Sequence, residues 1–233
     1  LEKELKKTGV TRQLMWEEYI SKHPDGIKRS QFNEHFNRWC KKVNPVMHMS
    51  HKAGDKMYVD YAGKTLQIVD KDSGEVRQVQ FFVAILGSSQ YTFAEASLSQ
   101  GKEDFISSVE NALHFFGGVP AAIVPDNLKS AVTKSNRYEP TLNETFMDFA
   151  EYYGTTILPA RVYKPRDKSL VEGAVKILYT RVYSALRDNV FFSFKEINIA
   201  IREALKSHNS AKLSGRPYSR QDLFAEVEKQ TLS

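Results

Sequence analysis

The sequence has little cysteine and no long apolar run, and each absence excludes a class of protein. Its 233 residues contain one cysteine, Cys40, which excludes an intrachain disulfide and a cysteine-clustered zinc site. The apolar run FFVAIL at 81–86 is far too short to span a bilayer, and no charged and then apolar signal segment precedes it. With 41% hydrophobic and 26% charged residues, the composition is that of a soluble globular protein, which we expect to be cytoplasmic.

The charges are unevenly distributed, with an acidic middle between two basic ends. Residues 1–56 carry 12 Lys and Arg against 7 Asp and Glu, residues 57–158 carry 7 against 13, and residues 159–233 carry 14 against 8. Basic ends suit a polyanion such as nucleic acid, and an acidic centre suits a metal site, although solvated faces also produce such asymmetry. The chain begins with leucine rather than methionine, so we expect a fragment of a longer protein.

The N-terminal segment predicts two short helices separated by a turn. Thr11 is a candidate N-cap for the first helix, HPDG at 23–26 ends it, and Ser30 can cap the second. The second helix has an apolar stripe made of Phe32, Phe36 and Trp39. Lys28 and Arg29 stand at its start, so the segment resembles a helix-turn-helix DNA reader. A plain helical hairpin explains the same pattern equally well.

From residue 57 the pattern becomes that of an α/β sheet. Alternating or continuously apolar runs predict strands, and apolar residues at helical spacing predict helices between them. The expected strands cover 56–62 continued by 64–70, then 75–87, 91–98, 119–127 and 155–160, and the expected helices cover 102–116, 143–153 and a long third helix that ends near Leu186. Three antiparallel strands followed by helix, strand, helix, strand and helix make a mixed sheet with two crossovers.

These elements divide the chain into four parts. We expect a helix-turn-helix-like DNA-binding segment at 1–43, a linker at 44–56, an α/β core at 57–190 and a C-terminal helical extension at 191–233. The extension has an apolar stripe of Ile197, Ile201 and Leu205, which we expect to pack on the core, although the stripe could instead mediate self-association. Ser219 and Asp222 then predict the capped start of a last short helix.

Three carboxylates occupy informative positions in this frame. Asp60 lies in the first strand, Asp126 at the carboxyl end of the fourth, and Glu172 near the start of the helix after the fifth. Ligands of open α/β sheets gather outside the carboxyl ends of the strands, and an aspartate within a strand requires a partner. A divalent cation is such a partner, and oxygen ligands favour Mg²⁺ or Mn²⁺ over zinc.

Each carboxylate also has an ordinary explanation. Ser169 and Glu172 have the spacing of a capping box, and Glu172 precedes Lys176 by four residues, the order that favours a surface ion pair. Asp126, which precedes an asparagine, is also typical of a turn, and Asp60 could face solvent at a sheet edge. The coincidence of all three acids in the required places favours the metal site.

The motifs VDYAG, VPDN and KSLVEGAVK, in this order, resemble those of the ribonuclease-H-like DDE transposases and integrases. GVTRQLMWEEY, SQFNEHFNRW, KAGDKMYVDYAGKT and KPRDKSLVEGAVK further resemble the IstA-type transposases of bacterial insertion sequences, over nearly the whole chain. The resemblance implies a ribonuclease-H-like mixed sheet of order β-β-β-α-β-α-β-α at 57–190. It also implies that Asp60, Asp126 and Glu172 form the metal-binding catalytic triad.

The same resemblance implies a reaction and its partners. Two Mg²⁺ or Mn²⁺ ions bound with DNA would assist cleavage at the transposon ends, followed by attack of the 3′ hydroxyl on target DNA. The expected partners are DNA, an AAA+ ATPase helper and further copies of the chain on DNA, in the bacterial cytoplasm at the nucleoid, with no membrane. The expected DNA-binding residues are Lys164, Arg166, Lys168 and Lys176 beside the site, and Lys28 and Arg29 in the N-terminal segment.

Two other functions stay open on the sequence alone. One is a noncatalytic DNA-binding or assembly module on the same fold, which has no chemical need for the three acids. The other is a different ribonuclease-H-like nuclease, such as one that resolves junctions or cleaves RNA.

Overall fold

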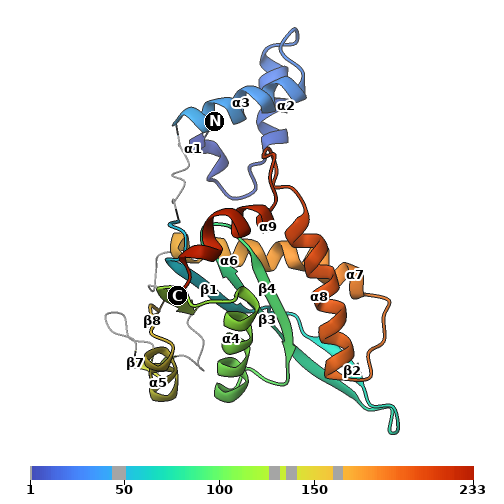
Figure 1. Cartoon of the computed structure of the whole chain (residues 1–233). Helices are drawn as coiled ribbons and strands as arrows, with labels where there is room; N and C mark the ends of the chain where they lie inside the picture. Colours follow the sequence, from blue (N-terminus) through green and yellow to red (C-terminus); the bar gives the residue numbers. More distant parts are fainter. Residues whose placement is uncertain (1, 44–50, 126–131, 135–140, 160–164) are drawn as a thin grey trace. The chain divides into compact units, whose positions relative to one another are not determined.

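The structure is a computed structural model, and it describes residues 2–43, 51–125, 132–134, 141–159 and 165–233 (Figure 1). The chain divides into two compact units, Leu1–Met49 and Ser50–Ser233.

The described residues of the first unit form three helices: α1 (Glu2–Leu5), α2 (Arg12–Lys22) and α3 (Arg29–Val43). The predicted N-cap of α2 is confirmed, because the Leu14 amide donates to Thr11 Oγ1 at 3.2 Å. The predicted cap of α3 is wrong. The Phe32 amide donates to the Lys28 carbonyl at 3.0 Å, so the helix begins at Arg29 and Ser30 already lies in its first turn.

Helices α2 and α3 pack through aromatic side chains. The rings of Tyr19 and Phe32 lie 5.6 Å apart, and Trp16 Nε1 donates to the Ile27 carbonyl at 3.1 Å. Of the predicted stripe, Phe32 and Phe36 are buried, whereas Trp39 is 43% exposed. The buried part of the stripe is therefore shorter than its spacing indicates.

The second unit is built on a mixed sheet (Figure 1). Its strands are β1 (Lys56–Tyr61), β2 (Leu66–Val69), β3 (Val76–Leu86), β4 (Thr92–Ser97), β5 (Ala122–Pro125) and β8 (Thr156–Ile157), in the order β2-β3-β1-β5-β8 with β4 paired to β3. Strands β1, β3 and β4 are antiparallel neighbours, and β5 pairs in parallel with both β1 and β8. A further hairpin joins β6 (Val132–Lys134) to β7 (Thr141–Leu142), and the sequence patterns do not predict it.

The first predicted strand is divided into two. Both β1 and β2 pair with β3, but the register changes from Tyr61 opposite Phe82 to Leu66 opposite Val79. Four residues separate the paired positions on one side and two on the other, so the extra residues at 62–65 form a bulge. The alternating pattern continues across this segment, which is why the sequence predicts one strand.

Two layers of helices cover the two faces of the sheet. Helices α4 (Lys102–Phe116) and α5 (Glu144–Tyr152) pack on the face that carries Met57, Val59 and Phe82. The four predicted core residues of α4, which are Phe105, Val109, Leu113 and Phe116, are all buried there. The αL conformation of Gly117, with φ 70°, ends this helix where the glycine pair predicts an end.

The opposite face is covered by α6 (Pro165–Leu178), a π-helical turn (Tyr179–Tyr183), α7 (Ser184–Leu186) and α8 (Phe194–Ser210). The predicted stripe of α8 is confirmed as core, because Ile197, Ile201 and Leu205 are at most 2% exposed. Asn198 of the same helix holds β4, since its side chain bonds the amide and the carbonyl of Ala96.

The C-terminal residues fold back onto the core. Ser219 and Asp222 form the predicted capping box of α9 (Arg220–Leu223). A π-helical turn (Phe224–Glu228) and a 3₁₀ turn (Lys229–Thr231) follow. The buried Glu228 carboxylate accepts backbone amides of Gly54, Ser88 and Ser89, with the shortest at 2.8 Å from Ser89. Within the described residues, none of the helices combines the length and the apolar character that a membrane span needs.

Candidate functional site

Asp60 lies on the sheet face that α6 covers. It is the fifth residue of β1, opposite Val83 of β3, and alternate residues of a strand share a face. Tyr58, two residues earlier on that face, is clustered with Val171 and Ala174 of α6. Asp60 is partly buried, and its Oδ1 accepts the Tyr61 amide at 2.8 Å. It therefore stands within the sheet and not at an outer edge, because β1 lies between β3 and β5.

Glu172 lies on α6, beside the residues that bind this helix to the sheet. Val171 and Ala174 are buried against Ile85 and Val124, whereas Glu172 is exposed. Since adjacent helical positions are about 100° apart, Glu172 projects to one side of the contact and not into it. The helix is thus fixed to the sheet by its apolar face, and its carboxylate stays accessible.

Both ordinary explanations of Glu172 fail in the structure. Helix α6 begins at Pro165, the residue type that favours a first helical position, so Ser169 lies inside the helix and cannot be its N-cap. The capping box is therefore excluded. Within the described part of the chain, Glu172 makes neither a hydrogen bond nor an ion pair. The predicted ion pair with Lys176, which is a described residue, is therefore not formed.

Several predicted site residues lie outside the described residues. Asp126 and Lys164 are among them, and Arg166 and Lys168 are described only by their helical backbone. The parallel register of β1 and β5 ends with Val59 opposite Pro125. Among the described residues, no three His, Cys, Asp or Glu side chains gather in a way that could hold a metal ion.

The remaining predicted DNA-binding residues are accessible. Lys176 is exposed on α6, one helical turn after Glu172. Lys28 and Arg29 are exposed at the start of α3 in the first unit. All three can therefore meet a phosphate without desolvating a buried charge.

A fourth acid, Glu95 of β4, is buried, although the sequence did not indicate it as a candidate site residue. Burial raises the pKa of its carboxyl group, while hydrogen bonds from Ser108 and Asn111 of α4 lower it. Glu95 pairs with Phe82, whose side chain belongs to the face covered by α4. It thus lies on the opposite face from Asp60 and belongs to a different environment.

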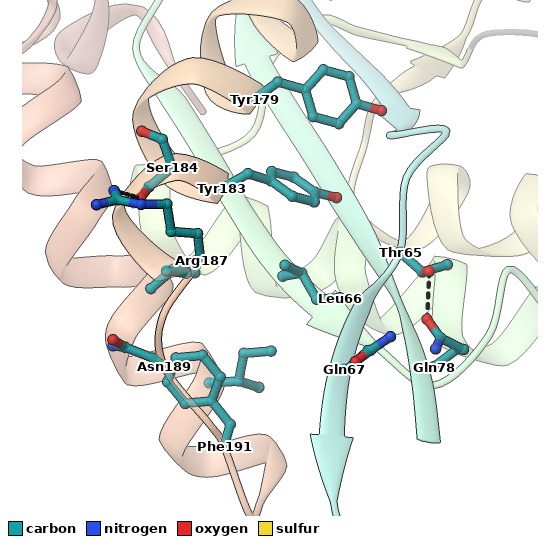
Figure 2. Close-up of a pocket in the computed structure, with 12 residues that line it drawn as sticks. Thr65, Leu66, Gln67, Gln78, Tyr179, Tyr183, Ser184, Arg187, Asn189 and Phe191 are labelled. Carbon is teal, nitrogen blue, oxygen red and sulfur yellow. Dashed lines mark hydrogen bonds between the residues drawn. The ribbon is translucent and has the colours of Figure 1, made fainter. Parts of the chain in front are cut away.

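A groove of about 490 Å³ lies between β2 and the C-terminal end of the Glu172 helix (Figure 2). Tyr179 and Tyr183 point from the π-helical turn toward the strand segment that carries Thr65. The Lys64 amide donates to the Tyr179 hydroxyl at 2.9 Å, and the Tyr183 hydroxyl donates to the Lys64 carbonyl. These bonds connect the bulge that follows Asp60 to the helix that carries Glu172. The sequence gives no signal for them, because the partners are 115 and 119 residues apart.

Comparison with known proteins identifies the family of the chain. No family model matches the chain. A putative transposase of Sinorhizobium fredii (y4bL/y4kJ/y4tB) is 45% identical over 230 residues, which cover 99% of this chain and 45% of that protein. A putative transposase for insertion sequence IS408 of Burkholderia multivorans is 41% identical over 222 residues, covering 94% of this chain and 42% of that protein. The chain belongs to the insertion-sequence transposases. The expected family is confirmed.

The transposase relatives include that of insertion sequence IS21 from Pseudomonas aeruginosa, which is 31% identical over 126 residues, 54% of this chain and 32% of that protein. This chain spans about 45% of the length of the first relatives it matches. Among solved structures, the HTLV-2 integrase catalytic core domain in complex with magnesium matches with a TM-score of 0.54 at 16% identity, covering 76% of this chain and 99% of that one. The expected ribonuclease-H-like fold of this transposase chain is thereby confirmed.

Proposed function

We propose that this chain carries the catalytic core of a DNA transposase, which cleaves DNA at transposon ends and joins the freed 3′ hydroxyl to target DNA. The observation that carries the proposal is the position of Asp60 and of the Glu172 helix on one face of an integrase-like sheet. Glu172 does not cap α6 and forms no ion pair with the described residues, which leaves its carboxylate available for another partner.

The proposed triad is Asp60, Asp126 and Glu172. Asp126 follows Pro125, and Pro125 is paired with Val59, the residue before Asp60. The described ends of β1 and β5 are therefore neighbours in the sheet, directly before Asp60 in one strand and before the residue that follows Pro125 in the other. This register supports a shared site.

The residues present fit Mg²⁺ or Mn²⁺. Asp60 and Glu172 supply hard carboxylate oxygens from separate elements, and the described residues around them supply no thiolate. Magnesium is usually bound through one or two protein carboxylates together with substrate phosphates. Two described carboxylates are therefore enough protein ligands for such a site. When bound, two such ions activate the attacking oxygen and stabilise the leaving oxygen. The magnesium complex of the similar HTLV-2 core supports this cofactor.

The protein's own residues would position the reactants. No side-chain nucleophile is needed, because water and then a DNA hydroxyl attack the phosphorus. Lys164, Arg166, Lys168 and Lys176 would neutralise phosphates beside the site, and Lys28 and Arg29 would bind DNA from the helix-turn-helix-like segment 1–43. The rest of the chain is divided, in this proposal, into a linker at 44–56, a catalytic core at 57–190 and a C-terminal extension at 191–233.

The proposed partners follow the family. An AAA+ ATPase helper and further copies of the chain on DNA are expected for an IstA-type transposase, and the IS21 relative supports that type. A similar fold occurs in the simian T-cell lymphotropic virus intasome, with a TM-score of 0.54 and 19% identity, covering 86% of this chain and 68% of that one. We propose a cytoplasmic protein that acts at the nucleoid.

The test is strand transfer by the full-length transposase with labelled transposon-end DNA in Mg²⁺, with and without the helper. Asp60→Asn, Asp126→Asn and Glu172→Gln should each abolish cleavage and joining while DNA binding persists, because each removes a charged ligand at nearly constant volume. Asp148→Asn and Glu151→Gln are matched controls, since both acids are exposed on α5 over the opposite face.

The outcomes separate the candidate functions. Near-normal activity in any triad variant removes that residue from the triad. DNA binding without cleavage by the wild type indicates the noncatalytic assembly module, and cleavage of junctions or RNA in preference to transposon ends indicates another nuclease.

A second measurement tests Glu172 without catalysis. A ligand that binds only the native state raises the melting temperature, so Mn²⁺ should stabilise the wild type more than Glu172→Gln. Lys176→Ala should keep the Mn²⁺ effect and weaken DNA binding, with a shallower salt dependence. Equal Mn²⁺ shifts in wild type and Glu172→Gln, with a measurable wild-type shift, would exclude Glu172 as a ligand.

A further inference from the structure

A second cavity, of about 190 Å³, lies behind α6 and is distinct from the groove of Figure 2. One part of its wall is aliphatic and comes from β3 and α6. The other part is polar and is formed by Arg220 at the start of α9, His208 near the end of α8 and Gln90 in the turn between β3 and β4. The cavity therefore has an apolar side and a cationic side.

Arg220 is a buried cation without a described counter-ion. It is 6% exposed, and no described carboxylate forms an ion pair with it. Asp222, the nearest acid in the sequence, is engaged by the Ser219 amide at 2.8 Å in the capping box. Burial, and then the positive charge of Arg181, lower the pKa of the Arg220 guanidinium. Buried charges are normally paired, so the part of the chain that the structure describes does not supply the partner that this environment requires.

His208 is also buried without hydrogen-bond partners. It is 2% exposed, and neither ring nitrogen has a partner among the described residues. Burial, and then Arg220 and Arg181, lower the pKa of its imidazole to about 3, so the ring is neutral at physiological pH. A neutral imidazole has one N–H donor, and leaving it unpaired in the interior costs free energy.

Gly173 supplies an independent indication of space for a ligand. It lies inside α6, where glycine is less favourable than alanine because it loses more backbone freedom on folding. A Cβ at this position would meet no atom within 4 Å, so no described neighbour requires glycine there. Because Gly173 lines the cavity, its missing side chain leaves the backbone of α6 open to an occupant.

We propose that this cavity binds a small monocarboxylate, with its oxygens on Arg220 and His208 and its short apolar part against α6. A guanidinium and a carboxylate form charge-assisted hydrogen bonds, and the His208 N–H adds a third donor. Arg220 is the buried cation and balances one negative charge, whereas Arg181, whose positive charge also acts on Arg220, is exposed to solvent. The site goes beyond the proposed DNA reaction and does not depend on it.

Thermal unfolding of the 233-residue chain in sodium propionate tests the site, with sodium chloride at equal ionic strength as the reference. At ten times the dissociation constant the ratio of folded to unfolded protein rises about eleven-fold, which raises the melting temperature by about 3–6 °C. Arg220→Met should abolish this rise without lowering the melting temperature in chloride, because it removes an unpaired buried charge. Arg216→Met, at an exposed position four residues earlier, should keep the full rise.

Two further readouts keep the proposal testable if Arg220→Met does not fold. Gly173→Leu should fill the cavity and remove the propionate effect, and propionate should shift the His208 ring nitrogen resonances of the wild type by NMR. Equal melting temperatures in propionate and chloride would indicate a cavity that holds only water, and would overturn the proposal. So would a propionate effect that survives in both variants, or stabilisation by inorganic phosphate but not by propionate.

Discussion

Acidification should destabilise the fold through His208. The pKa of this buried imidazole is about 3 in the folded chain, against about 6.5 when unfolded, so the unfolded state binds the proton more readily. The stability that neutral His208 contributes is therefore fully present above the pKa of its unfolded state, and it is lost as the pH falls below that pKa. At about pH 5 the unfolded state gains about 2 kcal/mol relative to about pH 7.5, which lowers the melting temperature by about 4–8 °C.

The assay compares melting temperatures of wild type and His208→Leu at the two pH values, in a piperazine buffer free of carboxylates. The variant cannot take up this proton. Acidification should therefore lower its melting temperature less than that of the wild type, and the difference should equal the decrease attributed to His208. His51, whose pKa is also lowered by burial, contributes equally to both proteins and cancels. His114→Leu, at an exposed position, controls for the loss of an imidazole. An equal loss in wild type and His208→Leu would refute the reasoning.

Three stability predictions follow from single contacts. Glu228→Gln should cost about 1–3 kcal/mol in chemical denaturation, because an NH₂ group then meets backbone N–H donors such as that of Ser89; a neutral result would contradict the anchoring role. Ile201→Ala should cost about 2–5 kcal/mol and Ile199→Ala much less, since the first is 0% and the second 51% exposed; equal costs would disprove the stripe. Ser219→Ala should cost about 1 kcal/mol in thermal melts, and no loss would exclude the cap.

The sequence predicted the elements whose signals are local. The stripes of α4 and α8, the glycine end of α4 and the caps at Thr11 and Ser219 all depend on residues a few positions apart. The errors at Ser30 and at the start of α6 have the same origin. Serine is a good cap wherever a helix happens to begin, and the sequence does not say which carbonyl takes the first hydrogen bond.

For the site, the sequence alone determined which acids to consider, in which order and on which kind of element, because strand and helix periodicities are local. Only the tertiary structure decided that Asp60 shares a face with α6, that Glu172 is neither a cap nor an ion-pair partner of any described residue, and that Lys64 connects to Tyr179 and Tyr183. The cavity lined by His208 and Arg220 could likewise not be predicted from the sequence. The physical reason is that burial and missing partners are properties of the space between elements, and distant segments define that space only when they pack.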